Sequence, residues 1–362
     1  MFRAPFATAE SVESAALVVG SGVFVVGAVI AAAVFWGREL PISGTASLGQ
    51  FIAVAGAISA AVVFAGARIL LRTQSADGVD STGGTALPLN ALDIAALALA
   101  HGLIALLGWT AVGDVIERCF SGAVVFTFPS VILAGVALAI TAYVTFLSAV
   151  KMTAVLLSLV LAVFLVVGVF TSMLSASDPH WWKENLSALG MTDDLSALAF
   201  NLTLIVAGVI VTTVAHAATA GMAAGEPAAA RGRRLVRIGL SLIGVFLACV
   251  GVFPVDRFLV IHNTVAMGMV GLFAALAIGL RWLIPQTPHV FVWLGYVFVA
   301  VIVVVGVFFA TGYYNLTAVE LVAAIVIFGW IILFLRTVGT SGASHVVAQP
   351  GPRQTAGLAK NH

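Results

Sequence analysis

The chain has 362 residues, of which 62% are hydrophobic and only 9% are charged, and its mean hydropathy is +1.16. A soluble globular chain carries roughly a quarter of charged residues, so this composition excludes that class and predicts an integral membrane protein. The formal net charge is +1 and the 16 basic residues are scattered along the chain, which argues against a nucleic-acid partner.

The N-terminal segment predicts a first membrane span that is not removed as a signal peptide. Arg3 is followed by the acidic Glu10 and Glu13. The apolar run that comes next is about 20 residues long, which exceeds the core of a signal peptide.

Further apolar stretches of about 20 residues follow, the length of helix that crosses the hydrocarbon core of a bilayer. They lack the alternating pattern of membrane β-barrel strands, so helices are expected. The predicted spans are residues 15–36, 48–71, 90–112, 124–149, 152–175, 194–222, 235–253, 258–281, 289–311 and 316–336. The predicted fold class is therefore an all-α, polytopic transmembrane helix bundle with about ten spans.

The basic residues predict the orientation of this bundle. With an even number of spans both termini share one side, and most of the 16 basic residues fall there, as the positive-inside rule requires of the cytoplasm. The residues on that side are Arg3, Arg68, Arg72, Lys151, Arg231, Arg233, Arg234, Arg237, Arg281, Arg336, Arg353 and Lys360, while Arg38, Arg118, Lys183 and Arg257 lie opposite. Both termini are predicted to be cytoplasmic.

The sequence also predicts a division into regions. Residues 1–149 form an N-terminal four-helix membrane region, and residues 150–338 form a six-helix membrane domain. Gly, Ser, Thr and Asp dominate the stretch from Thr73, which is typical of a flexible linker, and residues 339–362 are predicted to be a disordered cytoplasmic tail.

One loop between predicted spans is unusually polar. The stretch SDPHWWKENLSALG, residues 177–190, begins with an Asp-Pro pair typical of a helix start and ends at Gly190, so a short surface helix is expected near 178–189. A helical wheel puts Trp182, Leu186 and Leu189 on one side and His180, Lys183, Glu184 and Ser187 on the other. The helix is either an interfacial anchor or a lid whose polar side closes over a site.

Other polar residues gather on the same predicted outer side. His262 lies about one turn inside a predicted span, where an unsatisfied polar group is costly. It therefore either makes a structural hydrogen bond or serves as a ligand or catalytic group. The candidate ligand-binding residues are His180, Glu184, Ser187, Asn201, Asp256, Arg257, His262 and Asn263.

Several polar residues have local explanations. Asp193 and Asp194 suit the start of a helix, and Thr317 to Glu320 has the spacing of a capping box. His101, near the middle of the third span, either joins two helices by a hydrogen bond or takes part in proton relay or ligand contact.

Motifs of known chemistry are missing from the sequence. Cys119 and Cys249 form neither a CxxC pair nor a disulfide framework, and HExxH, GxSxG, the P-loop and GxGxxG are absent. A zinc site would require His180, His262 and carboxylates to converge in space. The pattern therefore specifies no cofactor and no metal site.

A resemblance covers roughly residues 152–336. The stretches NLSALGMTDDLSALAFNLTLIVAGVI, RRLVRIGLSLIGVFLACVGVFPVD and IHNTVAMGMVGLFAAL resemble the bacterial and archaeal integral-membrane family described as domain of unknown function nine-nine-eight. That family is similar in outline to the Frag, DRAM and Sfk type of six-helix membrane proteins. Its pattern falls here on Ser187, Leu189, Gly190, Asn201, Gly251, Phe253, Pro254 and His262, but Ala188 stands where an acidic residue usually follows the serine.

The resemblance implies an architecture and a polar cluster on the outer face rather than an activity. The function expected first is a non-catalytic factor of the plasma membrane that binds a lipid headgroup or another membrane protein at the extracytoplasmic face. The alternative is an intramembrane hydrolase or transferase for lipids, in which a metal ion or His262 activates water. The third expectation is a small-solute transporter, which few charges at mid-membrane depth disfavour.

Overall fold

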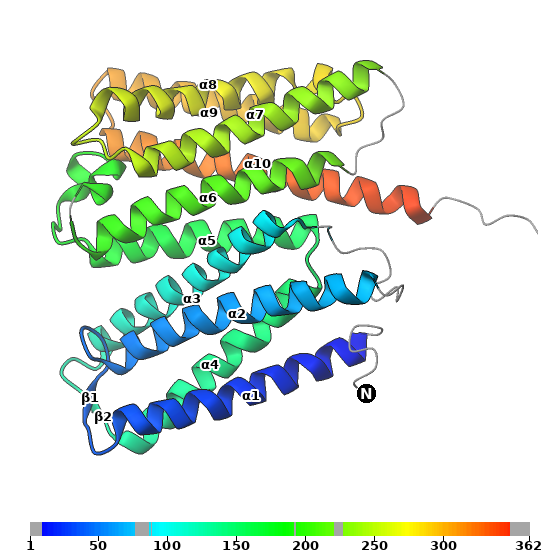
Figure 1. Cartoon of the computed structure of the whole chain (residues 1–362). Helices are drawn as coiled ribbons and strands as arrows, with labels where there is room; N and C mark the ends of the chain where they lie inside the picture. Colours follow the sequence, from blue (N-terminus) through cyan, green and yellow to red (C-terminus); the bar gives the residue numbers. More distant parts are fainter. Residues whose placement is uncertain (1–8, 77–86, 88, 192, 221–226, 348–362) are drawn as a thin grey trace, which may run out of the picture.

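The computed structural model describes residues 9–76, 87, 89–191, 193–220 and 227–347. Ten helices in these ranges are long and apolar enough to cross a membrane, which confirms the all-α, polytopic fold (Figure 1). They are α1 (Ala9–Phe35), α2 (Leu48–Ala76), α3 (Ala91–Cys119), α4 (Thr127–Val150), α5 (Ala154–Ser175), α6 (Leu195–Ala220), α7 (Pro227–Val252), α8 (Leu259–Leu283), α9 (His289–Ala310) and α10 (Leu316–Val347).

Some helices extend past the predicted spans. Helix α7 begins at Pro227, before the four arginines of its first turns, because proline suits the first helical position and arginine is a good helix former. Helix α10 continues to Val347 and so includes the first residues of the predicted tail. The rest of that tail, residues 348–362, and most of the predicted linker lie outside the described residues.

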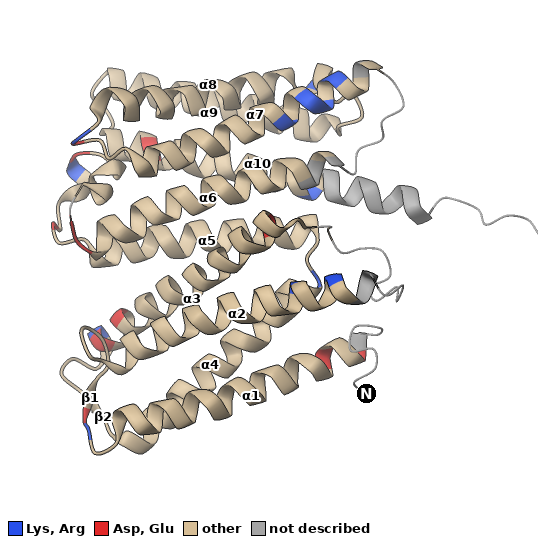
Figure 2. Cartoon of the chain, in the orientation of Figure 1, with Lys and Arg blue, Asp and Glu red and all other residues tan. Residues whose placement is uncertain are grey.

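The helices alternate in direction, so α1 begins and α10 ends at the same end of the bundle, here called the terminal end (Figure 1). The opposite end, called the loop end, holds the connections α1–α2, α3–α4, α5–α6, α7–α8 and α9–α10. Figure 2 shows basic residues gathered at the terminal end and acidic residues more frequent at the loop end. This asymmetry agrees with the sequence pattern, while the assignment of the terminal end to the cytoplasm stays a prediction.

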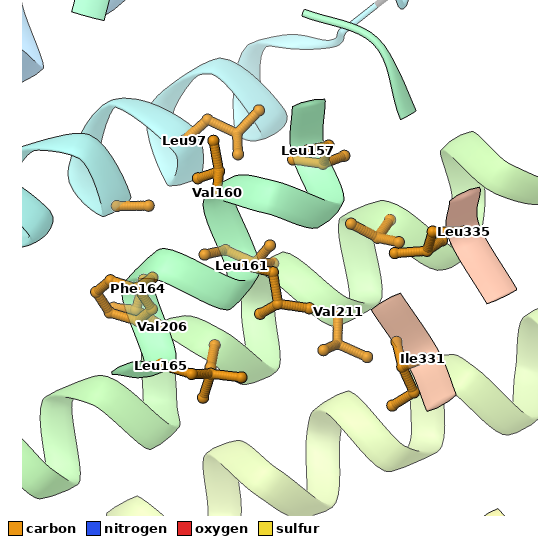
Figure 3. Packing of buried hydrophobic residues seen from close by; sticks show 14 of the residues in the cluster. Leu97, Leu157, Val160, Leu161, Phe164, Leu165, Val206, Val211, Ile331 and Leu335 are labelled. Carbon is orange, nitrogen blue, oxygen red and sulfur yellow. The ribbon is translucent and has the colours of Figure 1, made fainter. Parts of the chain in front are cut away.

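Helix α5 lies between two parts of the bundle, α1 to α4 and α6 to α10. Helix α1 packs along α4, and α2 packs along α3 and α4, while α5 contacts α3, α6 and α10. Figure 3 shows this central packing, with Leu97 of α3, Leu157, Leu161 and Phe164 of α5, Val211 of α6 and Ile331 of α10. One buried core includes residues from both sides of residue 150. The division into two domains at that point stays a prediction.

Two very short strands lie outside the spans. Strand β1 (Leu40–Pro41) pairs antiparallel with β2 (Val124–Val125), which ties the α1–α2 connection to the α3–α4 connection. Neither strand could be predicted, because two residues are too few to show a strand periodicity.

His101 makes a helix-to-helix hydrogen bond. Its Nε2 lies 2.9 Å from Ser148 Oγ of α4, its Nδ1 lies 2.7 Å from Leu97 O, and its ring stacks on Phe64 of α2 at 4.4 Å. Both ring nitrogens therefore have protein partners, which agrees with the hypothesis that His101 joins two helices by a hydrogen bond.

Candidate functional site

The segment 177–190 at the loop end is not one helix, and the prediction of a surface helix over 178–189 is wrong. It forms two 3-10 helices, η1 (Trp181–Lys183) and η2 (Leu186–Gly190). The break falls at Asn185, whose φ of −157° and ψ of 164° are extended. The physical reason is tertiary, because the Glu320 carboxylate of α10 accepts hydrogen bonds from the backbone N–H groups of Leu186 and Ser187.

Burial divides this segment along the chain rather than by helical face. Every residue of η2 is buried, whereas Trp182, Lys183 and Glu184 are exposed. The helical-wheel division is therefore wrong for Ser187, which was placed on the polar side and exposes only 9% of its surface. Trp182 and Lys183 lie side by side at the surface, with Lys183 Nζ 5.7 Å from the centre of the Trp182 ring.

Side chains from three helices hold η2 in place. Asn201 of α6 donates from Nδ2 to Gly190 O at 3.0 Å, His262 of α8 contacts Ser187, and Glu320 of α10 accepts from the backbone of η2. We call Ser187, Asn201, His262 and Glu320 the clasp. Asn201 can approach so closely because residue 190 is glycine, since a Cβ there would lie 2.5 Å from Asn201 Oδ1.

His262 is the buried centre of the clasp, with 4% of its surface exposed. Its Nδ1 lies 2.8 Å from Phe253 O and its Nε2 lies 3.1 Å from Ser187 Oγ. A carbonyl oxygen only accepts, so in the neutral ring Nδ1 carries the hydrogen and Nε2 accepts from the Ser187 hydroxyl. The expected proximity of His262 to the segment 177–190 is confirmed.

Glu320 is the clasp residue that sequence analysis missed. The capping-box assignment for Thr317 to Glu320 is wrong, because Asn315 Oδ1 accepts from Ala318 N at 3.0 Å at the start of α10. Asn315 also donates from Nδ2 to Trp182 O at 2.8 Å, which fixes η1. The sequence did contain a signal for the role of Glu320, because its carboxylate lies one turn inside an apolar helix, where an unpaired charge is costly.

The remaining candidates lie outside the clasp. Arg257 pairs with Asp193 at 3.2 Å and with Asp256 at 3.6 Å, and both pairs are at the surface. The exposed candidates around the clasp, which we call the rim, are His180, Glu184, Asp256 and Arg257, together with Trp182 and Lys183. Asn263 is exposed on α8 beside His262 and belongs to neither group.

The contacts of the clasp fit two roles, one catalytic and one structural. A serine hydroxyl bonded to an imidazole, with the second ring nitrogen bonded to a fixed acceptor, is the arrangement of an activated nucleophile. The same contacts also serve as structural bonds that fix a loop. Across the described ranges, His, Cys, Asp and Glu side chains do not gather in threes around a point where a metal ion could bind.

Comparisons of the chain with protein-family models, with curated proteins and with solved structures find no match. The site therefore has to be interpreted from its own geometry.

Proposed function

We propose that this multi-pass membrane protein is a non-catalytic factor that binds a phospholipid headgroup on the rim at the loop end, with the clasp serving as its rigid support. The proposal places the loop end on the extracytoplasmic face of the plasma membrane. It includes membership in the family of domain of unknown function nine-nine-eight, on the residues that carry that resemblance.

The clasp is the observation that carries this proposal. The imidazole and the hydroxyl of the clasp are buried, and its carboxylate and amide are half-buried. Removing such groups from water is favourable only when each has a partner. Each side chain of the clasp has a hydrogen-bond partner in another element. A surface fixed in this way loses little conformational entropy when a ligand binds.

The rim has the chemistry of a zwitterionic headgroup site. Lys183 Nζ lies 5.7 Å from the centre of the Trp182 ring, and Trp182 is 48% exposed, as tryptophans at a membrane boundary are. Lys183 and Arg257 of the rim offer donors to a phosphate, while Glu184 of the rim and the neighbouring exposed Asp178 offer acceptors to an ammonium group. Both signs of charge lie close to the membrane surface.

Lipid retention by the purified full-length protein tests the proposal. Native mass spectrometry would count phosphatidylethanolamine molecules retained by the wild type and by the double variant Lys183→Gln/Arg257→Gln. Loss of two charge-assisted contacts predicts retention lower by about tenfold or more. Arg118→Gln, an exposed arginine of the same end but outside the rim, is the matched control. Equal retention by the double variant and the wild type contradicts headgroup binding on the rim.

The Ser187–His262 pair favours a second candidate, an acyl hydrolase or transferase acting on lipids. The hydroxyl-to-imidazole distance of 3.1 Å is within the range of a nucleophile and its base. However, the N–H groups of Leu186 and Ser187 that could bind an oxyanion are occupied by Glu320. A fluorophosphonate probe distinguishes the two functions: labelling lost in Ser187→Ala but kept in Ser196→Ala supports the enzyme, and absence of labelling supports the binding factor.

A further inference from the structure

A groove of about 720 Å³ lies between α1 and α2, in the other part of the bundle from the clasp. Apolar side chains make up most of its lining, including Val23, Val26 and Ile30 of α1 and Val54 and Ile58 of α2. These helices are among the apolar spans, so the groove opens within the membrane rather than toward water. Its shape and lining suit a hydrocarbon chain.

The groove has the depth of one membrane leaflet. It extends along α1 from Gly22, near the middle of the helix, to Phe35, its last residue. At 1.5 Å per residue this distance is roughly 20 Å. Half of the hydrocarbon core is roughly 15 Å thick, so the groove begins near the bilayer centre and ends at the headgroup level of the loop end.

Polar residues close the groove at the headgroup level. Arg38 and Gln50 line this end, and Trp36 is 81% exposed beside it, as expected of a residue at the membrane boundary. Gly37 has a φ of +70°, so the chain turns sharply between the end of α1 and Arg38. The Arg38 backbone is then fixed by its N–H bond to Phe35 O at 3.0 Å.

This end of the groove offers hydrogen-bond donors. The Gln50 Oε1 accepts from Ala46 N at 2.7 Å, which fixes the amide and leaves its N–H groups for a ligand. Within the described part of the chain, Arg38 takes part in none of the ion pairs. The groove lining contains no Asp or Glu, although Glu39 follows Arg38 in sequence. The donors therefore suit a phosphate, and nothing in the lining suits an ammonium group.

From these observations we propose that the groove binds an anionic phospholipid of the loop-end leaflet, with one acyl chain between α1 and α2 and the phosphate on Arg38 and Gln50. The site is separate from the rim and differs from it in charge, because the rim has both signs. The proposal therefore stands independently of headgroup binding at the rim.

The test uses the full-length protein, delipidated in detergent and then offered phosphatidylglycerol or phosphatidylcholine, with retained lipid counted by native mass spectrometry. The wild type is expected to retain phosphatidylglycerol about tenfold better, the difference expected from one charge-assisted contact. Arg38→Gln should abolish this preference, whereas Arg118→Gln should keep it. Equal retention of both lipids by the wild type would mean ordinary annular lipid and would overturn the proposal.

A second pair of variants tests the acyl-chain part. Val26→Trp fills the groove and should reduce retention of phosphatidylglycerol, while Val29→Trp adds the same side chain to an exposed position of α1 outside the groove lining. Both valines are exposed, at 59% and 63%, so the variants should fold, which an unchanged melting temperature would verify. Equal losses in both variants would contradict the groove. The rim variant Lys183→Gln/Arg257→Gln should keep the phosphatidylglycerol preference, which separates failure of this proposal from failure of the proposed function.

Discussion

At the scale of single residues, the polar side chains of the loop end divide by their partners. Ser187, Asn201 and His262 have buried hydrogen-bond partners, whereas His180, Glu184 and Arg257 face the surface. A buried polar group whose partner is removed has a larger effect on stability than an exposed one. Substitutions should therefore separate the clasp from the rim by thermal stability alone.

The Ser187–His262 bond can be measured by a double-mutant cycle. His262→Ala leaves Phe253 O and the Ser187 hydroxyl without their partner and should lower the free energy of unfolding by about 1–3 kcal/mol. Ser187→Ala should have a smaller effect, and the two effects should not add, because both variants remove the same bond. Asn263→Ala, at an exposed position beside His262, is the control and should be near neutral. Strict additivity in the cycle would contradict the contact.

Part of this arrangement could be predicted from the residues. His262 and Asn201 stood out because polar side chains inside apolar spans need partners, and the turn at Pro254 placed His262 near the segment 177–190. The role of Glu320 was missed, because Thr317 offered a local explanation for a carboxylate one turn inside an apolar helix. Its real partners, the N–H groups of Leu186 and Ser187, are distant in sequence and are brought near only by the packing of α10.

At the scale of elements, hydropathy predicted the helices well and the connections poorly. Each span had an apolar run of sufficient length, which the bilayer allows only as a helix. The segment 177–190 had helix start and stop residues, yet the Leu186 N–H bonds to Glu320 and the segment forms two short 3-10 helices instead of one helix. Local signals decide structure only where no stronger partner competes for the backbone.

The contact between α6 and α7 depends on glycine. A Cβ at Gly208 would lie 2.3 Å from Gly244 O, and a Cβ at Gly244 would lie 2.5 Å from Gly208 O, so the two helix backbones touch. Close approach through small residues is a common way for membrane helices to associate. Gly208→Ala should therefore lower the melting temperature, since it forces the helices apart.

Gly271→Ala is the matched control for this prediction. It is also a helical glycine of a membrane span, but nothing lies within 4 Å of an added Cβ. It should leave the melting temperature unchanged or raise it slightly, because alanine has the higher helix propensity. The contact is contradicted when both variants melt at the same temperature.

At the scale of the whole molecule, the two ends differ in their charged and polar residues. The terminal end carries most of the described basic residues, and the loop end carries the clasp, the rim and the polar end of the groove. Composition could predict the membrane class and the number of spans. The groove could not be predicted, because it depends on the distance between α1 and α2 rather than on any motif.

The positive-inside rule predicts the orientation of this bundle, and reporter fusions test the prediction. A reporter after Gly339 should report from the cytoplasm, and a reporter inserted at Gly122, in the connection between α3 and α4, should report from outside. The reverse result at both positions would put the rim and the groove on the cytoplasmic side.

The central claim is that the side chains of the clasp hold the turn η2 as a rigid support for the rim, and amide hydrogen–deuterium exchange measures this most directly. In the wild type, peptides covering residues 186–190 should exchange much more slowly than those covering 178–184, because Glu320 accepts from the amides of Leu186 and Ser187. Glu320→Ala and His262→Ala should remove this protection, and Asn263→Ala should keep it. Rapid exchange of residues 186–190 in the wild type, equal to that of 178–184, would contradict the clasp.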